Sequence, residues 1–451
     1  MQISPASIFK QPYDSRAAGY DGSLLPSLPV TVAPGENIVK MISLLEWNGS
    51  NPTYVETAVI VTIVASPPTP NSYRPAYFRN NSAVAKTAWV ASQLRWDLYP
   101  SLALPPAPAC PPAPPALCTP PPPIDEVVTQ RYAMPQIDHL NGWTGGQIHP
   151  TVNMPGCHYG EAIVQASGLA ATLLLLDYNA STKAAAAHGL VQYGIDIGGI
   201  IAGGGSWSAN GGWQNGRKIV LGLASLVLGA TAMTDLTAGV PIDPQVTFSE
   251  DTEVWVAPHA ASPGGVLWGA LPSVEDAYWK LVVSGNGDRI MADPYGYIDG
   301  GPFAGGYYDF CCVYKPWKGE ALPQLMSTPL EALMNASGTN MLSFVLRRYR
   351  FGTWALPDPC APPTGACSDG SGRCAGWLGM PCGADAKGHC VLDLKDYGVL
   401  FGPSNSTPGE CIAGPGRFPG LHGQNVDAGD GEVDFVERMF AALVNSTGRF
   451  T

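Results

Sequence analysis

The sequence predicts a mainly α protein, with an (α/α)-toroid-like helical domain, an N-terminal β-rich region before it and a disulfide-rich loop region after it. Three observations predict this fold class. Helical apolar spacing dominates the middle of the chain, strand-like runs precede it, and most cysteines follow it in a Gly/Pro-rich segment. The predicted boundaries are 1–104 for the β-rich region, 105–125 for a Pro-rich spacer, 126–355 for the helical domain, 356–430 for the loop region and 431–451 for a closing helix.

Runs of Val, Ile and Thr predict strands over residues 28–32, 37–47 and 54–65 of the N-terminal region. The Pro34-Gly35 pair and residues 48–52 separate these runs as turns. Residues 105–123 are nearly all Pro, Ala and Cys, a composition that excludes helix and sheet and favours polyproline II. We therefore expect an exposed spacer there.

Residues 161–176 and 182–202 have helical apolar spacing, and turn and capping residues separate them, so we expect an αα-hairpin. A third helix over 219–231 follows Arg217 and Lys218, and the helix dipole disfavours cations there unless they meet a carboxylate or a ligand. Residues 248–255 resemble a strand or helix edge, and 303–318 a Gly- and aromatic-rich turn. Further helices are predicted at 273–283, 329–335, 341–350 and 433–444.

The composition excludes several partners. Only 13% of the 451 residues are charged and the net charge is −12, which disfavours nucleic acid and anionic lipid. No apolar run reaches about 20 residues, so we predict no membrane span. No nucleotide or metal motif is found, so neither a cofactor nor a metal is predicted.

Cysteines and glycosylation sequons indicate an extracellular or cell-surface protein. Since residues 1–10 lack the features of a secretory signal, we expect the sequence to start at a mature or partial N-terminus. The spacing of the late cysteines lacks the close pairs of structural zinc sites, so we expect disulfides, with the pairing in the late cluster left open. The expected disulfide cysteines are Cys110 with Cys118, and Cys360, Cys367, Cys374, Cys382, Cys390 and Cys411. The expected glycosylation sites are Asn48, Asn80, Asn179, Asn335, Asn405 and Asn445.

Three groups of residues are candidates for chemistry. In the first, His149, His158 and Tyr159 combine imidazole and phenol groups that can act as acid and base. The alternative is that these residues cap helices and tie loops together.

The third group is Glu250 and Asp251, since glycoside hydrolysis needs two carboxyl groups on opposite sides of one bond. Their alternative role is that of ordinary surface acids.

The second group is Asp196 with Arg217 and Lys218, joined by the Gly-rich loop of residues 203–215. Indole faces of Trp207 and Trp213 suit the apolar face of a sugar ring, and Asn210, Lys218 and Asp251 supply polar contacts to its hydroxyl groups. The predicted catalytic residues are thus His149, His158, Tyr159, Asp196, Arg217 and Glu250, and the predicted substrate-binding residues are Trp207, Asn210, Trp213, Lys218 and Asp251. The alternative is a structural ion pair between Arg217 and Asp196.

Residues 73–77, residues 210–218, Cys311-Cys312 with Trp317, and residues 396–399 through 414–419 carry a family resemblance. On these elements the chain resembles a family of large secreted or surface proteins from planctomycete-type bacteria and algae, which is loosely similar to (α/α)-toroid polysaccharide-active enzymes. The resemblance implies a toroid and a polysaccharide ligand. The family's Asn-Gly-Gly element continues with a histidine before Gly-Arg-Lys, whereas this chain has Trp213. If that histidine is catalytic in the family, this chain is altered or inactive.

The sequence therefore predicts a secreted glycoprotein that binds a polysaccharide and cleaves it as a glycoside hydrolase or a polysaccharide lyase. The alternative is an extracellular structural glycoprotein of a coat or filament, which self-assembles on an inactive enzyme-like scaffold. Low charge, many Pro and Gly residues, and Trp213 favour the alternative.

Overall fold

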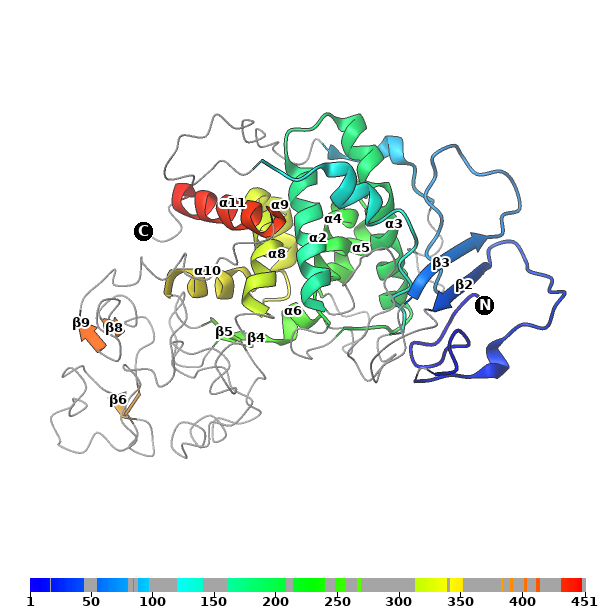
Figure 1. Cartoon of the computed structure of the whole chain (residues 1–451), viewed down its shortest axis with the longest axis horizontal. Helices are drawn as coiled ribbons and strands as arrows, with labels where there is room; N and C mark the ends of the chain where they lie inside the picture. Colours follow the sequence, from blue (N-terminus) through cyan, green and yellow to red (C-terminus); the bar gives the residue numbers. More distant parts are fainter. Residues whose placement is uncertain are drawn as a thin grey trace.

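The structure is a computed structural model in which helices form the body of the molecule and a small sheet lies at one end (Figure 1). About half of the described residues are helical, so the described part of the chain is mainly α, as predicted. The residues that the structure describes are 1–16, 18–43, 55–79, 84, 88–96, 120–140, 160–207, 214–239, 248–256, 266–268, 313–338, 341–351, 383–384, 390–391, 401–403, 411–413 and 431–447.

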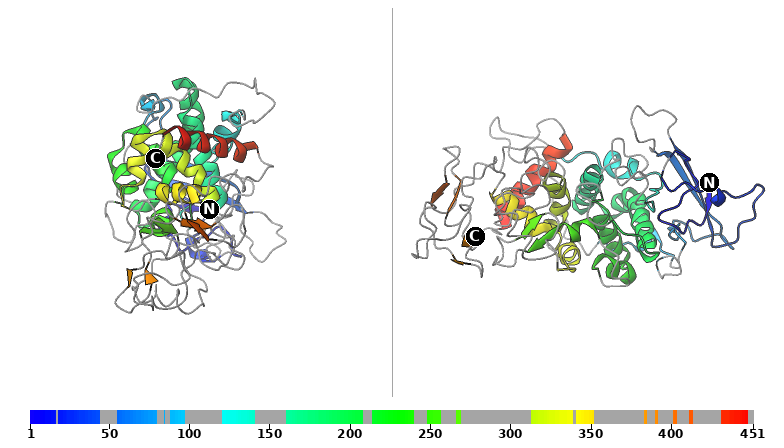
Figure 2. Two further views of the ribbon diagram at one scale, coloured as in Figure 1. Left: turned by 90° about the vertical axis from the view of Figure 1, so that its left-hand side faces the viewer. Right: turned by 90° about the horizontal axis from the view of Figure 1, so that it is seen from below.

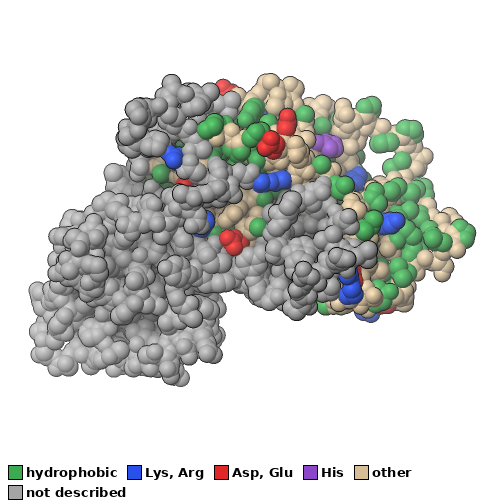
Figure 3. All heavy atoms as spheres, viewed as in Figure 1, with side chains coloured by type: hydrophobic (Ala, Val, Ile, Leu, Met, Phe, Trp, Pro, Cys, Tyr) green, Lys and Arg blue, Asp and Glu red, His purple; other side chains and the backbone are tan. Residues whose placement is uncertain are grey.

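Three antiparallel strands form the N-terminal sheet, in the order β1 (Gln2–Ile3), β2 (Asn37–Ser43) and β3 (Val55–Thr62). Alternation along the strands buries Val39, Met41 and Ala58, whereas Val59 and Val61 on the opposite face are about half exposed. Figure 3 shows hydrophobic side chains gathered at this end of the molecule. The strands predicted over 37–47 and 54–65 are therefore confirmed over 37–43 and 55–62, and the second strand ends before residues 63–65.

The strand predicted over residues 28–32 is wrong. Leu28 is 74% exposed, and residues 26–32 lie in no strand. Pro26 and Pro29 have no backbone N–H to donate to a sheet, which outweighs the β-branched residues that follow them. The two-residue β1 pairs with β2 instead, and its length is too short for a local pattern to predict.

The predicted central helices are confirmed with small changes of boundary: α2 (Gly160–Leu175), α3 (Ala180–Ala202) and α4 (Lys218–Leu228). Asn179 caps α3, because its side-chain oxygen accepts a hydrogen bond from the Thr182 backbone N–H at 2.8 Å. The helix predicted to reach residue 231 ends earlier, since Gly229 adopts a left-handed conformation with φ of 61°. A separate helix, α5 (Thr231–Thr237), follows.

The predicted hairpin of α2 and α3 does not form. Helix α2 packs mainly on α8 (Lys315–Met326), and α3 packs mainly on α4. In the view from below, the helices lie together and the blue N-terminal strands stand at one end (Figure 2). Gly168 makes the first of these contacts possible, because a Cβ atom there would overlap the backbone of Gly319. Long-range packing thus overrides the short connection between α2 and α3.

Helix α8 is the main helix that the sequence analysis missed, so the turn predicted up to residue 318 is wrong from Lys315 onward. Pro316 lies in the first turn of α8, where a missing N–H costs little, but Pro323 lies inside the helix and hides its helical pattern. The residues of α8 are almost all buried. Packing against α2 and α11 (Gly431–Thr447) therefore stabilises a helix that its own sequence disfavours.

The other described elements are short or peripheral. Residues 248–255 form the one-turn helix α6 and the start of β4, which matches the predicted edge. The bounds are α6 (Ser249–Thr252), α9 (Thr328–Met334), α10 (Met341–Phe351), the π-helical turn η4 (Asp125–Gln130), the 3₁₀ turns η1 (Gly22–Leu24) and η2 (Ala91–Gln93), and the strand pairs β4 (Val254–Val256) with β5 (Val266–Trp268), β6 (Gly383–Ala384) with β7 (Cys390–Val391), and β8 (Phe401–Pro403) with β9 (Cys411–Ala413).

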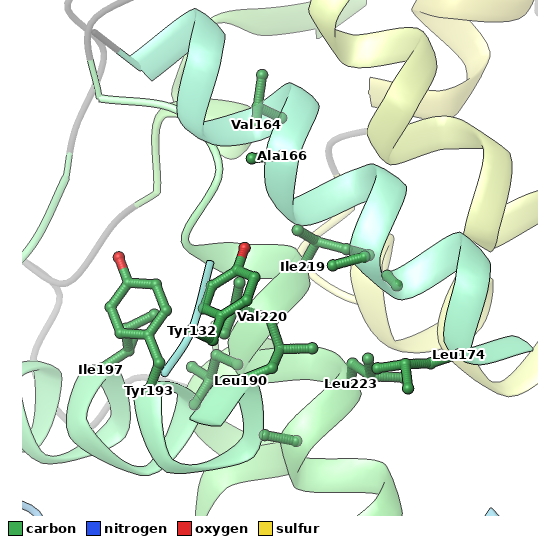
Figure 4. Close-up of a cluster of buried hydrophobic side chains, with 14 of the residues drawn as sticks. Tyr132, Val164, Ala166, Leu174, Leu190, Tyr193, Ile197, Ile219, Val220 and Leu223 are labelled. Atoms are coloured by element: carbon green, nitrogen blue, oxygen red, sulfur yellow. The ribbon is translucent and has the colours of Figure 1, made fainter. Parts of the chain in front are cut away.

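One hydrophobic core connects the helices. Figure 4 draws part of it, with Leu174 from α2, Leu190 from α3 and Leu223 from α4. All three side chains are at most 1% exposed, and each contributes about 1.5–3 kcal/mol by leaving water. The predicted spacer over 105–119, the helix predicted at 273–283 and the side chains of the predicted disulfide cysteines lie outside the described residues.

Candidate functional site

Part of the predicted site is described. Asp196, Arg217 and Glu250 from the predicted catalytic set are described, as are Trp207, Lys218 and Asp251 from the predicted substrate-binding set. His149, His158, Tyr159, Asn210 and Trp213 lie outside the described residues, and their roles stay predictions.

Arg217, directly before α4, forms a buried ion pair with Asp138. Its Nε lies 2.7 Å and its Nη2 3.0 Å from the two carboxylate oxygens, and neither side chain is exposed. The Tyr193 hydroxyl of α3 donates to the same carboxylate at 2.6 Å. Burial opposes the charge of Arg217, but Asp138 and Tyr193 outweigh it and raise the pKa of Arg217 above its usual range. This arrangement holds the start of α4 against α3.

Asp196 pairs with Arg74, so the predicted ion pair between Asp196 and Arg217 is wrong. Both terminal nitrogens of Arg74 donate to the Asp196 carboxylate, one of them at 2.6 Å. The Tyr77 backbone N–H donates to the same group at 3.2 Å. Burial raises the pKa of Asp196, and Arg74 acts against this effect. Asp196 thus ties the segment that contains Arg74 to the middle of α3.

Tyr77 connects the two ion pairs. Its hydroxyl accepts a hydrogen bond from the Asp138 backbone N–H at 3.1 Å and lies 3.1 Å from Nδ1 of His139. Burial lowers the pKa of His139 to about 3, so this imidazole is neutral and forms one hydrogen bond with the Tyr77 hydroxyl. The network is therefore continuous from Arg74 to Arg217.

Lys218, the first residue of α4, meets protein groups as well. Its Nζ donates to the Asp251 carboxylate and, at 2.6 Å, to the Met334 carbonyl. The Ser337 hydroxyl also donates to Asp251, at 2.8 Å. Arg217 and Lys218 thus each pair with a carboxylate, and this pairing offsets the unfavourable effect of the helix dipole on cations at the start of α4.

A pair of carboxyl groups lies beside these cations. Glu250 of α6 accepts a hydrogen bond at 2.6 Å from the backbone N–H of Gly216, which has a φ of +95° and no room for a side chain against Val164. The Glu320 carboxyl of α8 lies close enough to the Glu250 carboxyl for a hydrogen bond between them when one of the two is protonated. The two side chains are 2% and 0% exposed. Apart from their mutual contact, Oε2 of Glu250 and both oxygens of Glu320 have no hydrogen-bond partner among the described residues.

The surroundings of this carboxyl pair disfavour negative charge. Burial raises the pKa of Glu250 to about 7, although the Gly216 N–H lowers it in part. Burial, and then the charge of Glu250, raise the pKa of Glu320 well above its usual range. A carboxyl group with a pKa near neutrality can both donate and accept a proton, which is what acid–base catalysis requires.

Trp207 does not present its indole to a ligand. It is fully buried, it stacks on Phe248 with ring centres 6.4 Å apart, and the Arg217 guanidinium lies 5.9 Å from its ring centre. Its ring contacts the protein, as expected of a core residue. The predicted sugar-stacking role of Trp207 therefore finds no support in its position.

Several residues of this network were not chosen as site residues. Arg74 and Tyr77 stand in one of the elements that carry the family resemblance, and Asp138 belongs to the histidine-rich candidate segment but was not among the predicted catalytic residues. Glu320 had one signal, which is that it is the only acidic residue of the segment 315–326. The interior proline of α8 concealed that pattern.

Within the described part of the chain, no three His, Cys, Asp or Glu side chains are grouped so that they could hold a metal ion. None of the described helices combines the length and the apolar character needed to cross a bilayer. No protein-family model matches the chain, and neither a curated protein nor a solved structure matches it significantly. The family resemblance and what it implies therefore stay predictions.

Two of the predicted glycosylation sites have described side chains, and their surroundings differ. Asn179 is exposed and uses only its carbonyl oxygen to cap α3. At the other site, Nδ2 of Asn335 donates to the Glu331 carbonyl at 2.9 Å, and the Ser337 hydroxyl is bonded to Asp251. Asn48, Asn80 and Asn405 lie outside the described residues, as does the side chain of Asn445.

We expect Asn179 to be glycosylated at least several-fold more fully than Asn335 in protein purified from a glycosylating secretory host. The reason is that the Asn335 amide and the Ser337 hydroxyl are already engaged in the fold. Glycopeptide mass spectrometry with and without enzymatic deglycosylation measures both occupancies. Equal occupancy at the two sites would contradict the expectation.

Proposed function

We propose that this protein is a secreted glycoprotein that binds a polysaccharide and cleaves it by hydrolysis or elimination, with Glu250 as the acid–base residue. The observation that carries the proposal is the buried Glu250 carboxyl, whose pKa of about 7 suits proton transfer near neutral pH. In this proposal the helices belong to an (α/α) toroid and the disulfide-rich region lies beside it. His149, His158 and Tyr159 remain candidates for the second acid–base group.

The position of Glu250 supports a sugar ligand. Its hydrogen-bond donor, Gly216, directly follows the Gly-rich loop of residues 203–215, which carries Asn210 and Trp213. Trp213 can supply the aromatic platform that buried Trp207 does not. The Lys218–Asp251 pair beside Glu250 is 1% and 13% exposed, so Asp251 is the more accessible partner for a hydroxyl group.

Replacing Glu250 with Gln is expected to lower product release from a cleaved polysaccharide by about 100-fold or more, because the isosteric amide cannot transfer a proton. Reducing-sugar and unsaturated-product assays on a panel of algal and bacterial polysaccharides measure hydrolysis and elimination separately. Glu126→Gln, an exposed change in η4, is the matched control and should leave both rates unchanged. Asp196→Asn is a poorer test, because it disrupts the ion pair with Arg74.

If Glu250→Gln keeps the wild-type rate of product release while remaining folded, the acid–base role of Glu250 is wrong. Retained binding without cleavage by the wild-type protein would leave a glycan-binding protein and exclude the enzyme.

Two observations favour a second candidate, the extracellular structural glycoprotein of a coat or filament. Asp196, Arg217 and Lys218 all pair with protein groups rather than point toward a ligand. The outer face of the sheet also leaves Val59 and Val61 exposed for self-assembly. Light scattering and electron microscopy of purified protein test this candidate, which predicts polymers and no product release.

A further inference from the structure

The contact between Glu250 and Glu320 joins three elements, namely α6, α8 and the start of α4. We propose that Glu320 is the protonated member of this carboxyl pair and a positioning residue for Glu250, which makes the junction of these elements sensitive to pH. The proposal concerns the folded protein by itself and holds whether or not Glu250 is catalytic.

The hydrogen-bond donors around the pair determine which carboxyl group keeps the proton. Glu250 receives the Gly216 backbone N–H at 2.6 Å, which favours its anionic form. Glu320 receives no donor among the described residues and is fully buried. A buried carboxylate without donors is costly, whereas a carboxylic acid that donates to a neighbouring carboxylate satisfies both groups. Glu320 is therefore the acid of the pair, and Glu250 the acceptor.

The neighbouring charges do not change this assignment. Among the described residues, the charged or titratable groups that act on Glu250 include Arg217 and Lys218 at the start of α4, Asp251 in α6 and Glu320 in α8. Arg217 is committed to Asp138, and Lys218 to Asp251 and the Met334 carbonyl. Neither cation forms an ion pair with Glu320, and the raised pKa of Glu320 agrees with its protonated state.

The backbone positions Glu320 for this contact. Gly319 precedes it, and the close approach of Gly168 to Gly319 presses α8 against α2. The Gly216 N–H that holds Glu250 lies where Gly216 approaches Val164 of α2. Both carboxyl groups are thus held through the same helix, and Glu320 cannot withdraw without a shift of α8 relative to α2.

The sign of the pH effect follows from the pKa of Glu250. In the folded protein this pKa is about 7, compared with 4.5 for a free group. Between these values the folded state binds more protons, so Glu250 stabilises the fold at low pH and loses this contribution as the pH rises toward 7. The lowered pKa of His139 acts in the opposite direction below pH 6.5. A comparison of variants is therefore needed to isolate the carboxyl pair.

The test is urea unfolding of the full chain at pH 5 and pH 8, followed by circular dichroism, without any substrate. Relative to wild type, Glu250→Gln should gain on the order of 100-fold in the ratio of folded to unfolded protein between the two pH values, because it removes the titration. Glu320→Gln should also weaken the fall in stability between pH 5 and pH 8, because wild-type Glu320 keeps its proton in the folded state and loses it on unfolding, whereas the amide does not titrate. Glu320→Ala should lower the midpoint at pH 8, and Glu126→Gln should change nothing.

Two outcomes would overturn the proposal. One is a Glu320→Gln variant that keeps the wild-type pH profile, which would show that Glu320 is an anion in the folded protein as it is in the unfolded chain. The other is a Glu250→Gln variant that follows the wild-type profile. Both variants are isosteric, so the test stands even if Glu320→Ala does not fold. Failure of the glycan-cleavage assays leaves this test unaffected, because it uses no glycan.

Discussion

Replacing Arg217 with Met is expected to destabilise the protein by about 3–5 kcal/mol, because the change leaves the Asp138 carboxylate buried without its cation. Asp138 is completely buried, and Arg217 supplies two of its hydrogen bonds, at 2.7 and 3.0 Å. Only part of this charge can be compensated by the Tyr193 hydroxyl. Urea unfolding at pH 7 measures the loss, and expression level gives a first indication of it.

Arg79→Met is the matched control for this prediction. Arg79 is 67% exposed and lies 4.0 Å from Glu36, so its removal should cost less than about 1 kcal/mol. Asp138→Leu combined with Arg217→Met should recover part of the lost stability, because both buried charges are then removed. An Arg217→Met variant as stable as the control would mean that this pair does not hold α4 in place.

Replacing Gly168 with Ala is expected to cost about 1–3 kcal/mol or more, because the added methyl group overlaps the Gly319 carbonyl in the contact of α2 with α8. The change would otherwise favour α2 by about 1 kcal/mol, since Ala is the better helix former. The packing penalty must therefore exceed the gain in helix propensity. Thermal and urea unfolding measure the net effect.

Gly319→Ala tests the other side of the same contact. A Cβ atom at Gly319 would meet Gln165 backbone atoms at 3.7 Å, an ordinary van der Waals distance. We expect this variant to be neutral or slightly stabilised. Equal destabilisation by both changes would show that glycine is needed for backbone freedom rather than for the close approach of Gly168.

The elements that could be predicted from sequence are those with a local cause. The helices at 161–176 and 182–202 follow from apolar periodicity, and Asn179 was recognised as capping chemistry because its partner, Thr182, is only three residues away. Helix α8 escaped prediction because Pro316 and Pro323 argue locally against a helix. Its stability comes from burial against other helices, which a local pattern does not contain.

The roles predicted for the candidate site residues stay predictions. The structure shows that Asp196, Arg217, Lys218 and Glu250 are buried and that the Asp251 side chain is 13% exposed, which excludes ordinary surface acids for Glu250. Their partners were not predictable, because Asp196 is 122 residues from Arg74, and Arg217 is 79 residues from Asp138. A short-range sequence pattern does not predict which of several carboxylates will pair with a cation far away in the chain.

By itself the sequence determined the mainly α class, the two longer strands of the N-terminal sheet, the central helices and the cations at the start of α4. Only the tertiary structure decided that α2 packs on α8 instead of α3, that Asp196 and Arg217 belong to different ion pairs, and that Glu320 meets Glu250. The reason is physical: periodicity and capping act between residues a few positions apart, whereas buried charges take partners that only the packing of whole helices brings together.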